Sequence, residues 1–306
     1  MNKRPISYDD YKDVLVVTIT PRCPDRTVDV EGVKRNAVYL ADRGVKIIMP
    51  QCGTGLVYDS SLDDYRTTVE ATMEAVGERA YVIPGVGPGF GRAEEMGRIA
   101  REIGVDAVMI MPVVGPASPE GLYNGMCDLI ASLGLPVVLY LKDARLMPVD
   151  STVRLAGMSQ VHAIKYAVAD YDMFDALVQE VGDVVVLLCG MAEKPAVAFM
   201  DHGAQGYSSG MANFVPKLSL AMHRAHRTGD RAEVERIHGL MVPFEDVRGE
   251  EKGKYNAAAL HVANEHVGLS GGPVLPMCTD VAEIDLDRVR DLTDRLMAEE
   301  HAMGGV

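Results

Sequence analysis

Short apolar runs alternate with longer amphipathic stretches over most of this 306-residue chain. The runs are rich in Val and Ile and most are bounded by Gly, Pro or Asp, which is typical of strands buried on both faces of a parallel sheet. They cover residues 14–20, 45–50, 81–86, 107–111, 136–140, 161–165, 184–188 and 203–208. The intervening stretches have helical spacing. They cover residues 30–42, 61–76, 91–103, 119–133, 149–158, 170–181, 193–201 and 214–227.

Eight consecutive strand–helix units predict a closed (β/α)8 TIM barrel, with an open doubly wound sheet as the alternative. Helical spacing continues after the eighth unit, over residues 230–243, 253–267 and 285–300. We therefore expect residues 1–228 to form the barrel. Residues 229–306 are expected to form a C-terminal helical appendix packed on the barrel, so that the chain is a single structural unit.

The composition limits the cellular compartment and the classes of binding partner that are expected for the protein. A formal net charge of −14 disfavours binding to nucleic acid phosphates. No apolar run reaches the roughly 18 residues that a membrane span needs, and the first five residues lead into a polar segment instead of a secretory signal. Five cysteines without a CxxC pair fit reduced thiols. A cytoplasmic protein without membrane or nucleic acid partners is expected.

Barrel enzymes keep their active sites at the C-terminal ends of the strands, where two residues of this chain stand out. Lys165 closes the sixth strand, and strand alternation places it on the same face as Val161 and Ala163. If this face points inward, burial disfavours the ammonium form and makes a free amine available as a nucleophile. Tyr140 closes the fifth strand and could pass a proton to a carbonyl oxygen. Taken singly, a solvent-facing lysine and a rim aromatic are the ordinary interpretations.

Other strand ends offer backbone amides and hydroxyls. Gly53, Thr54 and Gly55 follow the second strand, where amides and a hydroxyl could converge on a carboxylate, although an ordinary turn has the same composition. Gly190 and Ser208 follow the seventh strand and close the eighth, and we expect them to line the substrate site. The glycine-rich run at residues 85–91 contains a proline and is interpreted as a loop instead of a dinucleotide site. The histidines lack completing ligands. No cofactor and no metal are therefore expected.

Taken in order, the strand ends resemble the dihydrodipicolinate synthase / N-acetylneuraminate lyase family of class I aldolases. The resemblance extends from about Val14 to Pro276 and includes motifs from both ends of the chain. They are Thr20-Pro21, Gly53-Thr54-Gly55, Pro119-Glu120-Gly121-Leu122-Tyr123, Leu139-Tyr140, Ile164-Lys165, Gly203-Ala204-Gln205-Gly206, Met211-Ala212-Asn213 and Gly272-Pro273-Val274. The resemblance implies an oligomeric enzyme, a dimer or tetramer, that binds a 2-oxo acid as an imine.

Carried over by position, the resemblance makes Lys165 the nucleophile, Tyr140 the proton shuttle and Thr54 the carboxylate-binding residue. The protein would be a lyase that acts on a pyruvate-type or 2-keto-3-deoxy sugar acid substrate by aldol cleavage or dehydration. Arg145, five residues past Tyr140, occupies the place of the synthases' distal carboxylate-binding arginine and is expected to bind the far end of the substrate. An ordinary solvent-facing arginine is the competing interpretation.

Departures from the family pattern keep two further functions open. The synthases usually carry paired tyrosines after the fourth strand, where this chain has Val113-Val114. The Gly53-Thr54-Gly55 loop is more similar to that of the sugar-acid dehydratases, including the 5-dehydro-4-deoxyglucarate dehydratases. A dihydrodipicolinate synthase that condenses pyruvate with aspartate semialdehyde is therefore the first alternative. A non-catalytic ligand-binding homologue is the second.

Overall fold

A computed structural model describes residues 3–303 of the chain. The strands are β1 (Val14–Val17), β2 (Ile47–Met49), β3 (Tyr81–Val82), β4 (Gly85–Val86), β5 (Val108–Ile110), β6 (Val137–Leu141), β7 (Val161–Tyr166), β8 (Val186–Cys189) and β9 (Gly206–Ser209). The helices are α1 (Val30–Asp42), α2 (Leu62–Val76), α3 (Phe90–Ile103), α4 (Pro119–Leu133), α5 (Val149–Ala156), α6 (Tyr171–Val181), α7 (Glu193–Asp201), α8 (Pro216–Thr228), α9 (Arg231–Gly253), α10 (Ala258–His266) and α11 (Glu283–Ala302). Two 3-10 turns, η1 (Tyr8–Tyr11) and η2 (Met211–Asn213), complete the order.

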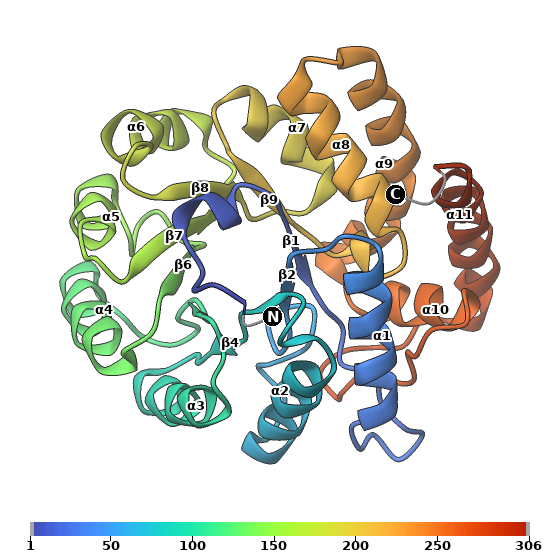
Figure 1. Cartoon of the computed structure of the whole chain (residues 1–306), viewed down its shortest axis with the longest axis horizontal. Coiled ribbons are helices and arrows are strands. Elements are labelled where there is room, and N and C mark those ends of the chain that lie inside the picture. The colour runs from blue at the N-terminus through green and yellow to red at the C-terminus, as the bar shows by residue number, and fades with distance from the viewer. Residues whose placement is uncertain (1–2, 304–306) are drawn as a thin grey trace.

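The strands form a closed parallel barrel surrounded by helices (Figure 1). Their order is β3-β2-β1-β9-β8-β7-β6-β5-β4, and β3 and β4 are two parts of one extended segment interrupted at Pro84. This segment bonds to β2 on one side, where the Ile83 amide donates to the Ile48 carbonyl (3.0 Å). On the other side the Met109 amide of β5 donates to the Pro84 carbonyl (2.9 Å). The predicted (β/α)8 barrel is confirmed, with its third strand in two pieces.

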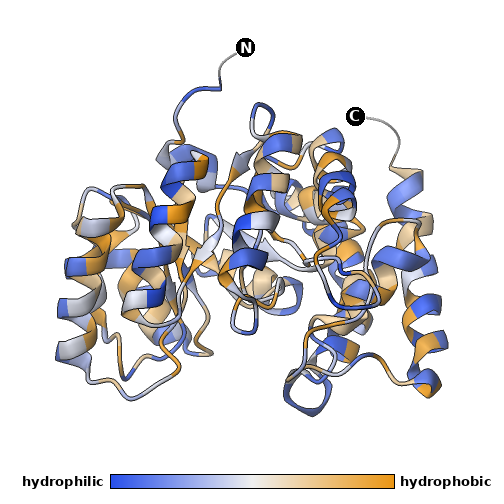
Figure 2. Cartoon of the chain, turned by 90° about the horizontal axis from the view of Figure 1, so that it is seen from below, coloured by the Kyte–Doolittle hydropathy of each residue, from blue (hydrophilic) through white to orange (hydrophobic). Residues whose placement is uncertain are grey.

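Alternation along the strands separates the barrel interior from the helix layer. In β7, Tyr166 packs outward against Phe174 of α6 and Phe199 of α7, with ring centroids 5.0 and 5.7 Å away. His162, on the same face, stacks on Tyr8 of η1. The residues between them, Ala163 and Lys165, consequently point inward. The helices turn apolar residues to the strands and polar residues outward (Figure 2).

Polar caps fix where several of the helices begin. The side chains of Asp29, Ser61, Ser118, Asp170 and Asp230 each accept a hydrogen bond from the amide three residues ahead. Such caps satisfy amides that have no partner within the helix, and each is worth about 1 kcal/mol. Four of these five caps lie in segments that lead from a strand to a helix, and Asp230 lies between α8 and α9, so the connecting segments themselves define where these helices begin.

The C-terminal helices differ from the prediction at two points, since α10 begins at Ala258 instead of residue 253 and α9 is longer than predicted. Helix α9 continues ten residues beyond the predicted end at Pro243 and includes Glu250–Lys252, whose backbone is not helical. The reason is tertiary packing, because the residues after Pro243 include the buried Phe244, Val247 and Arg248. Helix α9 lies against α7 and α8 (Figure 1).

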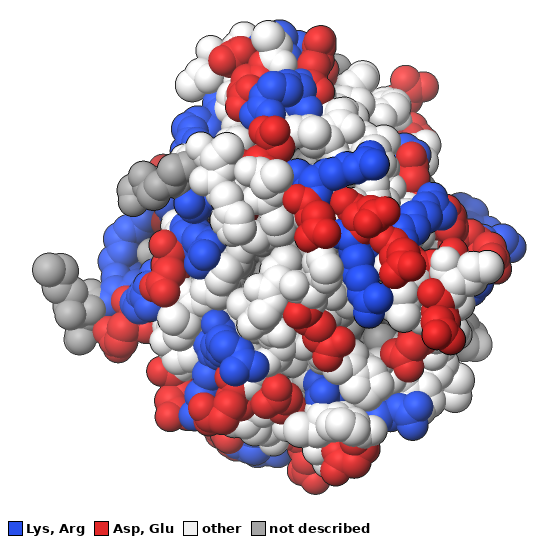
Figure 3. Space-filling model, turned by 90° about the vertical axis from the view of Figure 1, so that its right-hand side faces the viewer, with Lys and Arg blue, Asp and Glu red and all other residues white. Residues whose placement is uncertain are grey.

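The surface over α1, α10 and α11 carries acidic and basic side chains interspersed with one another (Figure 3). Exposed pairs such as Arg236–Glu299 (2.8 Å) link α9 to α11, and they contribute little individually because water screens them. Across residues 3–303, no helix combines the length and the apolar character that crossing a membrane requires.

Candidate active site

A cavity of about 500 Å³ opens at the C-terminal ends of the strands. Residues that follow or close β2, β6, β7, β8 and β9 contribute to its wall. The wall includes six of the eight site residues predicted from the sequence: Gly53, Thr54, Tyr140, Lys165, Gly190 and Ser208. Gly55 and Arg145 are the two that do not line it. Residues more than 150 positions apart in the chain therefore converge where barrel enzymes bind their substrates.

Lys165 lies inside the rim and is held in a defined position. Its side chain is only 6% exposed, and Nζ donates a hydrogen bond to the Gly190 carbonyl (2.9 Å). Nζ also lies 3.5 Å from the centroid of the Tyr140 ring, since Lys165 and Tyr140 are partners in the register of β6 and β7. A cation over an aromatic face is stabilised by the quadrupole of the ring. The two predicted catalytic residues are thus neighbours in the cavity.

Gly190 is required by this arrangement. A Cβ atom at this position would lie 2.8 Å from Cγ of Lys165 and 2.7 Å from the Tyr166 carbonyl oxygen, which real Cβ contacts do not allow. Because Gly190 has no side chain, the side chain of Lys165 has room to extend into the cavity. The sequence placed Gly190 in the substrate site. The contacts give it a second role, which is to position the lysine.

The surroundings of Tyr140 change the pKa of its phenol. Burial raises its pKa, but the positive charge and hydrogen bonding of Lys165, together with the positive charge of Lys142, outweigh burial and hold the pKa below its ordinary value of 10.0. By contrast, burial raises the pKa of the Cys52 thiol to about 12, so that cysteine is not an activated nucleophile. A phenol made more acidic beside an amine suits a proton-transfer role in the cavity.

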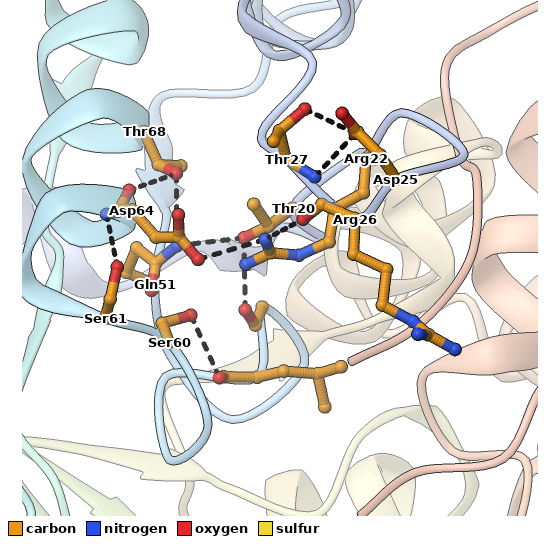
Figure 4. A network of polar contacts seen from close by, with 12 residues as sticks. Thr20, Arg22, Asp25, Arg26, Thr27, Gln51, Ser60, Ser61, Asp64 and Thr68 are labelled. Carbon is orange, nitrogen blue, oxygen red and sulfur yellow. Dashed lines mark hydrogen bonds and ion pairs between the residues drawn. The ribbon is translucent and has the colours of Figure 1, made fainter. Parts of the chain in front are cut away.

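The loop after β2 is anchored by a buried polar network (Figure 4). The Thr20 hydroxyl donates to the Gly55 carbonyl (3.0 Å), and the amide nitrogen of Gln51 donates to the hydroxyls of Thr20 (3.2 Å) and Thr68 (3.1 Å). The Thr68 hydroxyl in turn donates to the Asp64 carbonyl (2.7 Å). The network ties the loop to β1 and to α2, so its backbone amides are fixed before a ligand arrives.

The two glycines of this loop have different reasons to be glycine. A Cβ on Gly55 would lie 3.0 Å from the Thr18 carbonyl oxygen and 3.1 Å from the Gln51 nitrogen, so the loop backbone packs on the strand ends there. At Gly53, nothing lies within 4 Å of the Cβ position. Gly53 and Thr54 line the cavity, whereas Gly55 supports them from behind. A carboxylate could therefore approach the amides on the Gly53 side.

Arg145 lies outside the cavity wall. Its side chain is 91% exposed and binds Asp143 through Nε (3.1 Å) and Nη2 (2.7 Å). Of the basic residues in this loop, only Lys142 lines the cavity. The predicted contact between Arg145 and a substrate stays a prediction, and it requires the arginine to leave Asp143.

Sequence reasoning missed the contribution of α9 to the cavity. Four residues on and just after this helix line the cavity: Glu245, Arg248, Lys252 and Asn256. The helix was predicted to end at Pro243, which left Glu245, Arg248 and Lys252 without an assigned element, whereas Asn256 was assigned to a separate helix over residues 253–267. The spacing of Glu245 and Arg248, three apart on a helix, was the one signal that could have paired them.

A second buried carboxyl lies behind β9. Glu193, at the start of α7, accepts a hydrogen bond from the Ser209 hydroxyl, and the other carboxyl oxygen has no partner among the described residues. Burial, together with the nearby charge of Glu245, raises the pKa of Glu193 to about 8. The raised pKa favours the protonated form of Glu193 in the folded protein.

This raised pKa predicts a pH-dependent stability. The unfolded chain releases the Glu193 proton near pH 4.5, whereas the folded protein keeps it until about pH 8. Between these values the folded state binds more protons, so stability falls as the pH rises. Thermal melts between pH 5.5 and 8 should show a smaller decline in Tm for Glu193→Gln than for the unmodified protein. Equal slopes would mean that Glu193 is ionised in the folded state.

No group of three or more His, Cys, Asp or Glu side chains within the described residues could hold a metal ion. The residues at the strand ends are instead an amine, a phenol, hydroxyls and backbone amides. This set can form an imine with a carbonyl compound, move protons and bind a carboxylate.

Comparisons with known proteins agree with this chemistry. A family model described as the dihydrodipicolinate synthetase family matches residues 10–295. A probable 5-dehydro-4-deoxyglucarate dehydratase of Streptomyces avermitilis is 29% identical, covering 93% of this chain and 86% of that protein. A probable dehydratase of the same name from Bacillus subtilis is 27% identical, covering 84% of each chain. A crystal structure of dihydrodipicolinate synthase from Bacillus clausii superposes with a TM-score of 0.88 at 29% identity, covering 95% of this chain and 98% of that one.

Proposed function

The chain belongs to the dihydrodipicolinate synthetase family, and from this premise we propose that it dehydrates a 2-oxo sugar acid through an imine on Lys165. The predicted family and the lyase class are confirmed by the match. The single observation that supports the mechanism best is the pair at the cavity wall, the buried Lys165 with its amine over the half-buried Tyr140 ring.

The arrangement supports a simple sequence of steps. The Lys165 amine attacks the keto carbon of the substrate, and the keto oxygen leaves as water. The resulting protonated imine withdraws electrons, so a proton can leave the neighbouring carbon and hydroxide can leave the carbon after it, together as water. A water molecule then hydrolyses the imine, which restores the keto group of the product and frees the Lys165 amine. Tyr140 passes protons between these atoms, while Thr54 and adjacent amides hold the carboxylate next to the keto group.

The relatives named as dehydratases support a substrate of the 5-dehydro-4-deoxyglucarate type. The likeness to a solved dihydrodipicolinate synthase keeps that condensation as the second candidate. Against it stand Val113 and Val114, where the synthases usually carry tyrosines. Two assays separate the candidates, one with 5-dehydro-4-deoxyglucarate and one with pyruvate plus aspartate semialdehyde. Turnover only in the second assay would replace the dehydratase with the synthase.

The assembly and location follow from the resemblance to the family. We propose a homo-oligomer, a dimer or tetramer, that works in the cytoplasm on a small-molecule acid. Light scattering on the purified protein measures the assembly. A monomer at micromolar concentration would contradict this proposal.

Thr54→Val tests the carboxylate site, because valine keeps the shape of threonine and removes only the hydroxyl. A buried hydrogen bond to a charged group is worth roughly 1.5–3 kcal/mol, so the affinity for pyruvate is expected to fall about tenfold or more. Borohydride trapping at increasing pyruvate concentration measures it. Thr54→Ser retains the hydroxyl and should bind nearly as well as threonine. An unchanged affinity in the valine variant would remove Thr54 from the site.

A further inference from the structure

We propose that Arg248 and Lys252 at the end of α9 form an anion subsite for a second carboxylate, at the far end of a dicarboxylic 2-oxo acid. This inference rests on the proposed function, since it concerns the same cavity and the same imine. It assigns the recognition of the far end of the substrate to α9 instead of the loop after β6.

The guanidinium of Arg248 lies at the catalytic end of the barrel. A Cβ atom on Gly210 would lie 2.6–2.9 Å from three of its atoms, Nη2, Nη1 and Cζ. Gly210 directly follows β9 and is two residues past Ser208. The arginine can therefore lie flat against the backbone there only because position 210 has no side chain. Arg248, Gly210 and Lys165 all line the same cavity.

The guanidinium is fixed and still has hydrogens to donate. Nε donates to the Asn256 carbonyl (3.0 Å), Nη2 donates to the Asn256 side-chain oxygen (2.7 Å), and Nη1 donates to Glu245. These bonds engage three of the five N–H groups of arginine. Among the described residues, each terminal nitrogen retains one further hydrogen, which is the number that a carboxylate needs for a bidentate contact.

Burial makes such a contact strong. The Arg248 side chain is 5% exposed, so a carboxylate bound there is poorly screened by water. Glu245 offsets the charge of Arg248, and Lys142, Lys165 and Lys252 supply further positive charge in the cavity wall. Lys252 adopts a positive φ of 66° in the non-helical turn of α9 and lines the same cavity as Arg248. Arg248 thus offers a fixed guanidinium, and Lys252 adds a second, exposed positive charge.

The net positive charge of the cavity wall also favours the binding of a second anion. Its wall carries four cationic side chains, Lys142, Lys165, Arg248 and Lys252, and one acidic side chain, Glu245, in a protein whose net charge is −14. The carboxylate next to the keto group, held at Thr54, neutralises only part of this excess. Arg145 is a weaker candidate for the far carboxylate, because it is 91% exposed and already paired with Asp143.

Two probes of equal length isolate the second carboxylate. 2-Oxoadipate and 2-oxohexanoate each have six carbons and a 2-oxo acid head, and only the former has an acid at the far end. Borohydride trapping on Lys165 at increasing concentration gives the apparent affinity for each. We expect the unmodified protein to prefer 2-oxoadipate by tenfold or more, the scale of one charged hydrogen-bonding contact.

The variants are chosen to keep the fold intact. Removing Arg248 alone would leave the buried Glu245 unpaired, so the double change Glu245→Gln with Arg248→Gln is compared with Glu245→Gln alone. Lys252 is exposed, so Lys252→Met tests the subsite without disturbing the core. Arg236→Gln, on the same helix but paired with Glu233 and Glu299 at the surface, is the matched control.

The double change is expected to reduce the preference for 2-oxoadipate at least tenfold relative to Glu245→Gln, and Lys252→Met about threefold. Arg236→Gln should leave it unchanged. An unaltered preference in both the double variant and Lys252→Met would overturn the subsite, as would a loss found in Arg145→Ala instead. Absence of any adduct of the unmodified protein with pyruvate would refute the imine function itself, which is a separate result.

Discussion

Replacing Lys165 by alanine is expected to abolish the covalent adduct that borohydride forms with pyruvate, and to reduce dehydration to the uncatalysed level. The physical reason is that the imine is the only electron-withdrawing group in the proposed mechanism, and alanine has no amine to form it. Intact-mass analysis after reduction measures the adduct, and peptide mapping should place it on Lys165 in the unmodified protein.

A matched control tests whether the loss of adduct and activity is specific to Lys165. Lys194 is exposed on α7 and paired with Asp246, so Lys194→Ala should keep both the adduct and the activity. The Lys165→Ala variant should also retain its thermal stability within about 1 kcal/mol, because it removes one inward side chain and no tertiary ion pair. An adduct that persists in Lys165→Ala, or maps to another lysine, would refute the assignment.

The barrel could be predicted because its strands are short apolar runs with clear boundaries. The interruption of the third strand at Pro84 was not predicted, since residues 81–86 were interpreted as one apolar run although Pro84 and Gly85 lie inside it. Proline lacks an amide hydrogen on the side that faces β5, where the Pro84 carbonyl accepts from Met109, so the ladder splits there while the barrel still closes. The C-terminal helices were predicted less well. Pro243 is a helix breaker in a sequence pattern, but the packing of Phe244 and Val247 carries α9 past it.

The residues of the candidate site also differ in how far the sequence could predict them. Lys165 and Tyr140 could be found because alternation within one strand fixes which way a side chain points. The roles of Gly190 and Gly210 could not, because each depends on a side chain from another element that needs the space. Arg248 and Lys252 were missed for a related reason: they reach the cavity from beyond the eight repeated units. Local patterns thus identify reactive groups, whereas specificity is set by contacts between distant segments.

Replacing Tyr140 by phenylalanine is expected to lower the rate of dehydration by about 10²- to 10⁴-fold, the usual contribution of a positioned acid or base. Phenylalanine keeps the ring over which the Lys165 amine lies at 3.5 Å, so the position of the nucleophile is preserved and only the hydroxyl is lost. The adduct with pyruvate should therefore still form on Lys165, but more slowly. Single-turnover trapping against time measures the slower imine formation, and steady-state assays measure the loss in kcat.

The pH profile supplies an independent test of the same role. Because Lys165 and Lys142 hold the Tyr140 pKa below 10.0, the unmodified enzyme should lose activity on the alkaline side as the phenol gives up its proton. This alkaline limb should disappear in Tyr140→Phe. Tyr171→Phe, in the outer helix layer where the ring packs on Phe199 and His202, is the control and should change neither rate nor profile. A full rate in Tyr140→Phe would mean that water, not the phenol, carries the proton.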